Sequence, residues 1–397
     1  MNSPTPASRP TLERRGAGVS RFCGNTAETR AWLALARMPG VPPAEIRAAI
    51  DAAGSAAEVV RSIIDGSDPR GLPRAVCEAL GVAARRPDPA VERWLDDPRH
   101  HLLAYGDADY PAALATITGP PLVLYVDGDV DVLHLPQLAI VGSRRPTPAG
   151  RELAHRFGAE FGRAGLAVTS GLALGIDAAA HRGALAGGGR TVAVCGTGLG
   201  SVYPPEHAAL AREIADRGAL VSEFPLDFPP RAAHFPQRNR VISGLSLGVL
   251  VVEAALRSGS LITARMAGEQ GRAVFAVPGS THNPMARGCH RLIRDGAQLV
   301  ESAGDVVSDL DFGLVWPGSA PCPEAPRAGR AAAGQLDRGR EMLLNALGFD
   351  PVDLDTLVER TGLEAQVLSA RLLVLEIEGE VESRGGRFCR ASTGRTS

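Results

Sequence analysis

The middle of this sequence, residues 138–310, predicts an α/β domain built on a doubly wound, mostly parallel sheet. Two observations predict it. Short apolar runs rich in β-branched residues recur through this region, and they end near Gly, Ser or Glu. Helical patterns separate the runs, which supplies the crossover that parallel strands need between them. Strands that are apolar throughout are typical of a sheet covered by helices on both faces.

The strands and helices of this region follow one another in a regular order. Strands are predicted at 138–142, 166–171, 191–196, 219–223, 248–253 and 273–277. Helices are predicted at 148–164, 176–186 and 260–270. Such a Rossmann-like sheet binds its ligands at the carboxyl ends of the strands. The residues that directly follow each strand are therefore the first candidates for a functional site.

The region before the sheet predicts a small helical domain over 26–100. Within it, Ser55 and Glu58 have the spacing of a capping box. Two short helices around a Pro-Gly turn are typical of a helix-hairpin-helix or SAM-like domain, and a plain helical cap fits the pattern as well. Residues 101–310 then form a connector, with one strand at 122–126, and the extended Rossmann-like domain.

The two ends of the chain and the segment after the sheet have different characters. Residues 1–25 predict a disordered tail, and residues 311–336 predict a linker rich in Pro, Gly and Ala. Residues 337–397 predict a winged-helix-like domain, because three helical patterns precede a Gly-Gly hairpin. The third helix, usually the reading helix, carries three glutamates and a single arginine, Arg371. Since acidic side chains repel phosphate, we expect this domain to contact protein rather than duplex DNA.

The composition narrows the class of protein. The 397 residues are 45% hydrophobic and 22% charged, as in an ordinary globular protein. No apolar run reaches the length of a transmembrane helix, and the start of the chain lacks the apolar core of a signal peptide. None of the six cysteines stands in a CxxC pair, so we expect no metal site, free thiols and a cytoplasmic location.

The charge is unevenly distributed along the chain. The net charge is −2, but residues 138–310 hold 18 arginines against 14 acidic residues, a surplus of +4. Residues 337–397 hold 8 arginines against 11 acidic residues, a net −3. All 42 basic residues are arginine, whose planar fork pairs with phosphate or stacks on a base. A surface that attracts phosphate is therefore expected on the sheet domain.

Several glycine- and serine-rich turns follow strands and precede helices, where free backbone N–H groups favour an anion. The candidates for phosphate contact are Gly142, Ser143, Arg144, Gly171, Gly175, Ser258, Gly259, Ser260 and Arg287. Ordinary turn formation, or N-capping by Ser260, explains part of this set equally well. Neither a GxGxxG nor a Walker A motif is present, so we expect no nucleotide cofactor.

The stretch from His234 to Arg240 combines an aromatic ring with two cations. Phe235 precedes Arg238, Asn239 and Arg240. A base stacked on such a ring contributes ~1–3 kcal/mol, while guanidinium groups meet the phosphates of a single strand. In the alternative interpretation, one of the two arginines pairs with an acid of the sheet, either Glu223 or Glu253.

Motifs for catalysis are scarce. The sequence contains neither HExxH nor GxSxG, and no paired-carboxylate motif. Glu253 ends a strand, where an acid could serve a nucleotide or nucleoside hydrolase. We therefore expect that this protein is not an enzyme, and a nucleotide or nucleoside hydrolase is the alternative.

An ordered set of motifs resembles the DprA (Smf) family. It runs through Ile140–Arg144, Ser170–Asp177, Phe235–Arg240, Ser243–Ala254 and Ser258–Thr263, and continues with Val277-Pro278-Gly279, Asn283-Pro284 and Arg287-Gly288. The resemblance implies a Rossmann-like domain that binds single-stranded DNA and forms homodimers. It also implies delivery of that DNA to RecA, past the single-strand-binding protein, during natural transformation, with no cofactor and no membrane partner.

The resemblance also assigns roles to residues. Gly142, Ser143 and Arg144 would hold a phosphate, and Phe235 and Arg238 would lie at the DNA pocket that Asn239 and Arg240 shape. Many family members carry a lysine three residues before the phenylalanine. Here that position is Ala232, so Arg231 is the candidate replacement. An adaptor that acts through the acidic C-terminal domain is a further alternative, compatible with the first.

Overall fold

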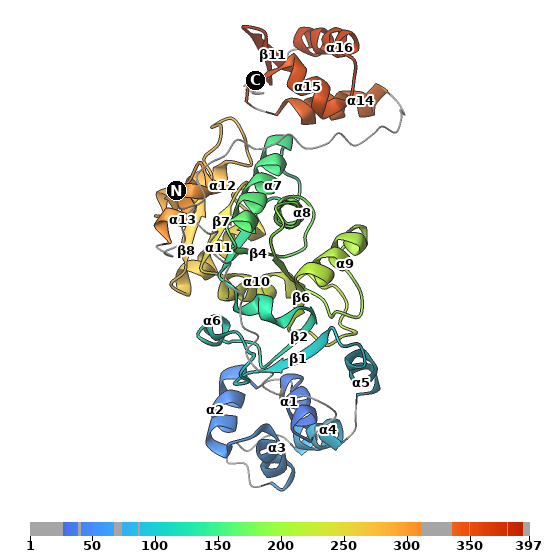
Figure 1. Ribbon diagram of the computed structural model, residues 1–397, viewed down its shortest axis with the longest axis vertical. Coiled ribbons are helices and arrows are strands. Elements are labelled where there is room, and N and C mark those ends of the chain that lie inside the picture. The colour runs from blue at the N-terminus through green and yellow to red at the C-terminus, as the bar shows by residue number, and fades with distance from the viewer. Residues whose placement is uncertain are drawn as a thin grey trace, which may run out of the picture.

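The computed structural model describes residues 27–38, 41–66, 74–85, 88–310, 336–348, 350–378 and 380–391. Figure 1 shows helices at one end of the long axis, the large sheet in the middle, and a small domain at the other end. The tail predicted at 1–25 lies outside the described residues, and so does the predicted linker apart from its last residue.

The central sheet of the described residues has nine strands in the order β1-β2-β6-β5-β4-β3-β7-β8-β9. They are β1 (His100–Ala104), β2 (Val123–Gly128), β3 (Gln137–Val141), β4 (Ala167–Ser170), β5 (Thr191–Val194), β6 (Ala219–Ser222), β7 (Gly248–Val251), β8 (Ala273–Ala276) and β9 (Gln298–Leu299). Strands β3 to β9 pair in parallel, while β1 and β2 add an antiparallel edge next to β6. The predicted doubly wound, mostly parallel sheet is confirmed.

The order of the strands creates a switch point beside β3. The chain runs outward through β4, β5 and β6, then returns to place β7 on the other side of β3. Ala139 of β3 lies opposite Thr169 of β4 on one side and opposite Val249 of β7 on the other. The loops that leave β3 and β7 therefore diverge, and open sheets of this kind bind their ligands in the crevice between such loops.

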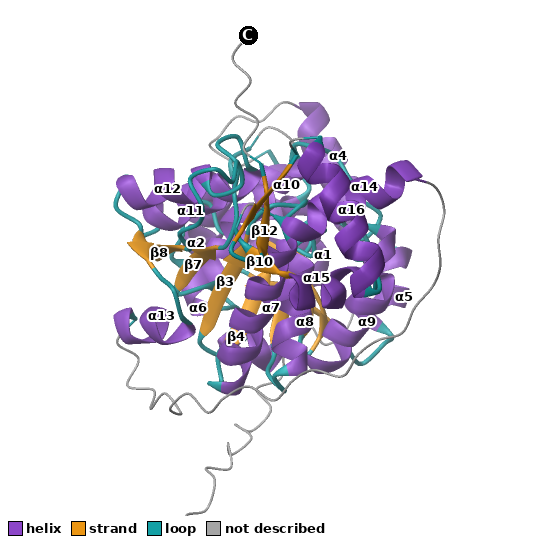
Figure 2. Ribbon diagram, turned by 90° about the horizontal axis from the view of Figure 1, so that it is seen from above, coloured by secondary structure: helices purple, strands orange, loops and turns teal. Residues whose placement is uncertain are grey.

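Helices cover both faces of this sheet, as Figure 2 shows. One face carries α7 (Pro148–Arg163), α8 (Ile176–Ala186), α9 (Ala208–Arg217) and α13 (Ala303–Asp309). The other carries α6 (Ala112–Ala115), α10 (His234–Leu245), α11 (Gly259–Glu269) and α12 (Arg287–Arg294). Leu138 and Ile140 of β3 belong to the first core, and Ala139 and Val141 to the second. Alternate residues of each strand thus fill two separate apolar layers.

The helical part before the sheet packs on the antiparallel edge. It contains α1 (Ala27–Ala36), α2 (Pro43–Ala53), α3 (Ala56–Ile64), α4 (Arg74–Arg85) and α5 (Pro89–Leu95). Its core shares residues of β1 and β2, among them Leu102 and Tyr125. Ser55 caps α3 by accepting from the Glu58 N–H at 3.2 Å. Glu28 of α1 accepts from the first two N–H groups of α3, those of Ala56 and Ala57, so this cap is partly tertiary.

The C-terminal domain matches its prediction of three helices followed by a hairpin. It has α14 (Leu336–Leu347), α15 (Leu354–Thr361) and α16 (Ala365–Ile377), with β10 (Val352–Asp353), β11 (Val381–Arg384) and β12 (Arg387–Arg390). The strands pair in the order β10-β12-β11. Arg360 donates to Glu152 of α7 at 3.2 Å across the boundary with the sheet domain. Among all described helices, none is long and apolar enough to cross a membrane.

His181 of α8 is a fully buried histidine with a determined tautomer. Its Nδ1 lies 2.6 Å from Oγ1 of Thr191, and that hydroxyl donates to the Val168 carbonyl at 2.6 Å. Because the hydroxyl hydrogen is already used, Nδ1 must carry the proton and donate. Nε2 is then an unprotonated, buried nitrogen without a hydrogen-bond partner among the described residues. Burial lowers the pKa of His181 to about 3.

The lowered pKa of His181 predicts that the folded chain loses stability in mild acid. The pKa is lower in the folded chain than in the unfolded one, so the unfolded chain binds the proton more readily. The contribution of the neutral imidazole to the free energy of unfolding is complete above the pKa that His181 has in the unfolded chain. Below that pKa the contribution is lost as the pH falls, at about 1.4 kcal/mol per pH unit. His181→Gln, which does not titrate, should therefore differ from wild type less at pH 5 than at pH 7 in urea unfolding. An equal difference at both pH values would refute the neutral tautomer.

Candidate functional site

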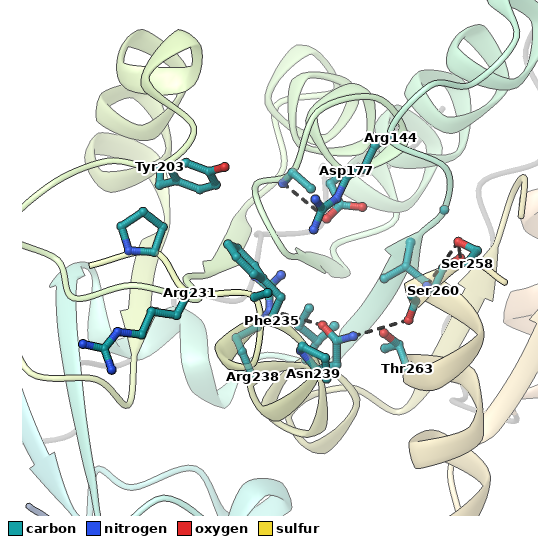
Figure 3. A pocket seen from close by; sticks show the side chains of 18 residues that line it. Arg144, Asp177, Tyr203, Arg231, Phe235, Arg238, Asn239, Ser258, Ser260 and Thr263 are labelled. Atoms are coloured by element: carbon teal, nitrogen blue, oxygen red, sulfur yellow. Dashed lines mark hydrogen bonds between the residues drawn. The ribbon is translucent and has the colours of Figure 1, made fainter. Parts of the chain in front are cut away.

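A cleft of about 640 Å³ opens at the carboxyl ends of β3, β4, β5 and β7, at the switch point. Figure 3 shows side chains from separate segments around it: the loops after β3 and β5, the start of α8, the segment that leads into α10, and the starts of α10 and α11. Nine of the fourteen sequence-predicted residues line it: Gly142, Arg144, Arg231, Phe235, Arg238, Asn239, Ser258, Gly259 and Ser260. Tyr203, Asp177 and Thr263 are among the further lining residues.

Two aromatic rings form one wall of the cleft. Phe235 is half-buried, and its ring centroid lies 5.7 Å from that of Tyr203, with the planes tilted by 45°. Gly196 makes room for this ring, because a Cβ there would lie 2.8 Å from Phe235 Cδ1. The guanidinium carbon of Arg144 lies 5.3 Å from the Phe235 centroid. The arrangement offers a flat apolar surface next to a cation, which suits an aromatic ligand that carries negative charge.

The two exposed arginines of the cleft differ in direction. Neither Arg144 nor Arg231 forms an ion pair with an acid among the described residues. Figure 3 shows Arg144 reaching toward Asp177 above the cleft, whereas the guanidinium of Arg231 points away from Phe235. That guanidinium lies over the ring of Phe228, with its carbon 5.7 Å from the centroid. Arg144 is therefore the cation best placed to meet a ligand on the rings.

Arg238 is a buried support of the cleft floor. Only 4% of it is exposed, and its Nη1 donates to the carbonyls of Gly171, at 2.8 Å, and of Val194. It thereby joins α10 to the carboxyl ends of β4 and β5. Burial lowers the pKa of Arg238, although the nearby Asp177 carboxylate acts in the opposite direction. Because Nη1 donates to these carbonyls and Nε donates to Asn239 Oδ1 at 3.3 Å, we assign this guanidinium a supporting role in the floor.

Asp177, in the first turn of α8, has a structural role. Its carboxylate accepts from the N–H groups of Gly171, at 3.1 Å, and Ala173, at 3.4 Å, and so braces the turn before α8. Burial raises the pKa of this carboxyl, and the charges of Arg238 and Arg144 oppose that shift.

The start of α11 lies opposite the rings. Ser258 is the N-cap and accepts from the Ser260 N–H at 3.3 Å, while the two hydroxyls lie 2.6 Å apart. The cap is thus Ser258, two residues earlier than the Ser260 of the alternative interpretation. Asn239 donates to the Gly259 carbonyl at 3.4 Å and connects α10 with α11. The positive end of the α11 dipole lies on this side of the cleft.

Five predicted residues lie away from the lining. Ser143 is buried beneath Arg144, and Gly171 packs against the guanidinium of Arg238. Gly175 has a positive φ of 84°, and a Cβ there would lie 2.4 Å from the Ser143 carbonyl oxygen, so it shapes the turn. Arg287 begins α12 outside the cleft. Arg240 lies on another face of α10 and donates to Glu223, so the pairing with an acid of the sheet is realised here.

Known protein families match the sheet domain and the C-terminal domain of this chain separately. Residues 101–311 match the family model described as DNA recombination-mediator protein A, and residues 324–387 match the DprA winged helix domain. The chain belongs to the DprA family. It is 44% identical over 301 residues to Protein Smf of Escherichia coli (strain K12), covering 75% of this chain and 79% of that one. It is 45% identical over 202 residues to DNA processing protein DprA of Bacillus subtilis (strain 168), covering 51% and 68%.

A solved structure agrees with this membership. The X-ray structure of DNA processing protein A from Streptococcus pneumoniae is similar with a TM-score of 0.62 and 34% sequence identity. The similarity covers 71% of this chain and 98% of that chain. The match of residues 324–387 to the DprA winged helix domain confirms the predicted winged-helix-like domain.

Tyr203 is the main lining residue that the sequence did not reveal. It follows the glycine-dense turn Gly196–Gly200 after β5, at the same edge of the sheet as the other candidates. Residues in the loops after parallel strands are expected at the same edge of the sheet, and this signal extends to Tyr203 because it lies in the loop after β5. Its proximity to Phe235, 32 positions later, is a product of the tertiary fold.

Glu253, the acid of the hydrolase alternative, is occupied elsewhere. Its carboxylate accepts from the Thr147 N–H at 2.8 Å, the Thr147 hydroxyl at 2.7 Å and the Asn283 amide at 3.2 Å. It does not line the cleft, and it fastens the start of α7 to β7. No observation at the cleft of this DprA-family chain favours the hydrolase.

Proposed function

We propose that this chain binds single-stranded DNA in the cleft beside Arg144 and Phe235, and loads RecA onto that DNA as a mediator in natural transformation. The observation that carries the proposal is the pair of rings, Phe235 and Tyr203, with Arg144 beside them, which forms no ion pair with an acid in the described part of the chain. Membership of the recombination-mediator family supports the same class of ligand. RecA, the single-strand-binding protein and a second copy of the chain are the partners we propose, in the cytoplasm.

The chemistry of the cleft favours a single strand over a duplex. Bases of a duplex are stacked on each other and paired, so their faces are not free to lie on Phe235 or Tyr203. Bases of a single strand present a π-face to any ring, whatever the sequence. The start of α11 and Arg144 supply the donors for the phosphates between such bases.

The winged helix suggests a second, compatible role as an adaptor. The exposed side of α16 carries Val367, Leu373, Val374 and Ile377, which are 42%, 57%, 53% and 78% exposed. Apolar side chains of this size on a helix that also carries Glu364 and Glu376 suit a protein partner better than a phosphate backbone. This face is our candidate for the contact with RecA.

The test of DNA binding is fluorescence anisotropy with a labelled dT oligonucleotide and a matched duplex across a salt series. Tighter binding of the single strand is expected, and the logarithm of affinity should fall by about 0.7 for each phosphate contact per logarithmic unit of salt. Equal binding of both DNAs, or none at low salt, would contradict the proposal. RecA loading is measured separately, as RecA filament assembly on DNA coated with single-strand-binding protein.

A further inference from the structure

A second cavity, of about 570 Å³, lies beside α10 and between the helical domain and the sheet domain. It is bounded by the end of α1, the start of α2, the segment 121–123 and the residues that follow β6. The residues that matter here are Ala36, Met38, Phe228, His234, Gln237 and Arg240. None of them lines the first cleft.

The two cavities share one helix as a common wall. Phe235, Arg238 and Asn239 of α10 line the first cleft, whereas His234, Gln237 and Arg240 line the second. This alternation follows the 3.6-residue period of the helix, so the two sets project from different sides of its first turns. A helix with side chains is about 10–12 Å across, which brings the two cavities close together.

The second cavity contains polar groups that lack a partner. Arg240 donates to Glu223 through Nη2, but its Nη1 is buried with no hydrogen-bond partner in the described part of the chain. The same holds for Nδ1 of His234, a residue that is 8% exposed. Burying such groups without a partner costs about 1–3 kcal/mol each. Both atoms lie within the wall of the cavity, each with less than 1 Å² of exposed surface, so a ligand that completes them must displace the side chains that cover them.

The charge balance excludes a phosphate as that ligand. Arg240 is paired with Glu223, and Arg37 is paired with Asp88 at 2.9 Å. Asp227 adds an exposed carboxylate to the lining. The walls are otherwise apolar, with Met38 and an aromatic group in which His234 stacks on Phe224 and Phe228 at 4.7 Å each. A flat, neutral heterocycle with donors and acceptors at its edge fits this lining.

Arg231 stands at the boundary between the two cavities. It lines the first cleft, yet its guanidinium lies over Phe228, which lines the second. A phosphate that passes over this boundary would meet an arginine without an acidic partner among the described residues. From these observations we propose that the second cavity holds a base of the same DNA strand that lies on Phe235. This inference rests on the proposed function, and it adds the helical domain to the DNA-binding surface.

The test fills the second cavity without touching the first. Ala36 is exposed at the end of α1 and lines only the second cavity, so Ala36→Trp would occupy it. Ala48→Trp is the matched control, because Ala48 is an exposed alanine of α2 outside both linings. Both variants are first compared with wild type by thermal unfolding, so that a folding defect is recognised.

The expected result is a length-dependent loss of affinity. Ala36→Trp should bind a twenty-nucleotide dT strand about tenfold more weakly than Ala48→Trp, equivalent to about 1.4 kcal/mol. With strands shortened until they occupy the first cleft alone, the two variants should bind equally. Photo-crosslinking of wild type with 5-iododeoxyuridine in the long strand should label Met38, Phe228 or His234 as well as Tyr203 or Phe235.

Two results would overturn the inference while leaving the proposed function intact. One is equal affinity of Ala36→Trp and Ala48→Trp for the long strand. The other is crosslinking confined to Tyr203 and Phe235. If wild type itself binds no single strand, the proposed function fails, and this inference with it.

Discussion

Replacing both Arg144 and Phe235 with alanine is expected to lower the affinity for a dT strand by about a hundredfold. Loss of base stacking on the ring removes ~1–3 kcal/mol, and loss of one phosphate contact adds to it. The salt dependence should also become shallower, by about 0.7 in slope for the lost phosphate contact. Fluorescence anisotropy across a salt series measures both quantities.

Arg145→Ala is the matched control for this variant. Arg145 is exposed and adjacent to Arg144, but it does not line the cleft. Its removal should leave both affinity and salt slope close to those of wild type. If Arg145→Ala weakens binding as much as the double substitution, the effect comes from general positive charge, and the cleft is not the site.

Arg238→Ala is expected to destabilise the folded chain by about 2–4 kcal/mol. Two carbonyl groups, of Gly171 and Val194, lose their donor in a buried place. The missing side chain also leaves a cavity between α10 and the ends of β4 and β5. Urea unfolding monitored by circular dichroism gives the change in the free energy of unfolding.

Arg231→Ala separates stability from DNA binding. Arg231 is exposed, so its replacement should change the free energy of unfolding by no more than about 0.5 kcal/mol. It should nevertheless weaken the binding of long single strands.

If Arg238→Ala instead unfolds like wild type and loses DNA affinity, its guanidinium contacts the ligand directly and the supporting role assigned to it is wrong.

Much of the sheet could be predicted because its signals are local. Strands β3 to β8 are short apolar runs, and each ends within three residues of a glycine, serine or glutamate. Helix α8 has the predicted bounds, 176–186, whereas α7 differs from its prediction by one residue at its end and α11 by one residue at each end. Strands β1 and β9 escaped prediction. The pairing of β1 with β2 depends on contacts more than twenty residues away, and β9 has two exposed residues with no apolar pattern.

Helix α10 shows why the candidate site was harder to predict. Its residues include a proline in the first turn, two arginines and a glycine, so the apolar period of a helix is weak. The sequence left open which of Arg238 and Arg240 pairs with an acid. Side chains two residues apart on a helix point about 200° away from each other. Arg238 therefore contacts the strand ends, whereas Arg240 contacts Glu223.

The sequence by itself determined the order of strands β3 to β8 and of the helices predicted between them, the edge of the sheet at which a ligand is expected, and the residues that follow each strand there. Those features depend on patterns within a few residues. The tertiary structure alone decided which arginines are free, since Arg144 is exposed whereas Arg238 and Arg240 are held by distant partners. It alone brought Tyr203 to Phe235, because contacts between separate loops depend on how the whole sheet packs, which no local pattern encodes.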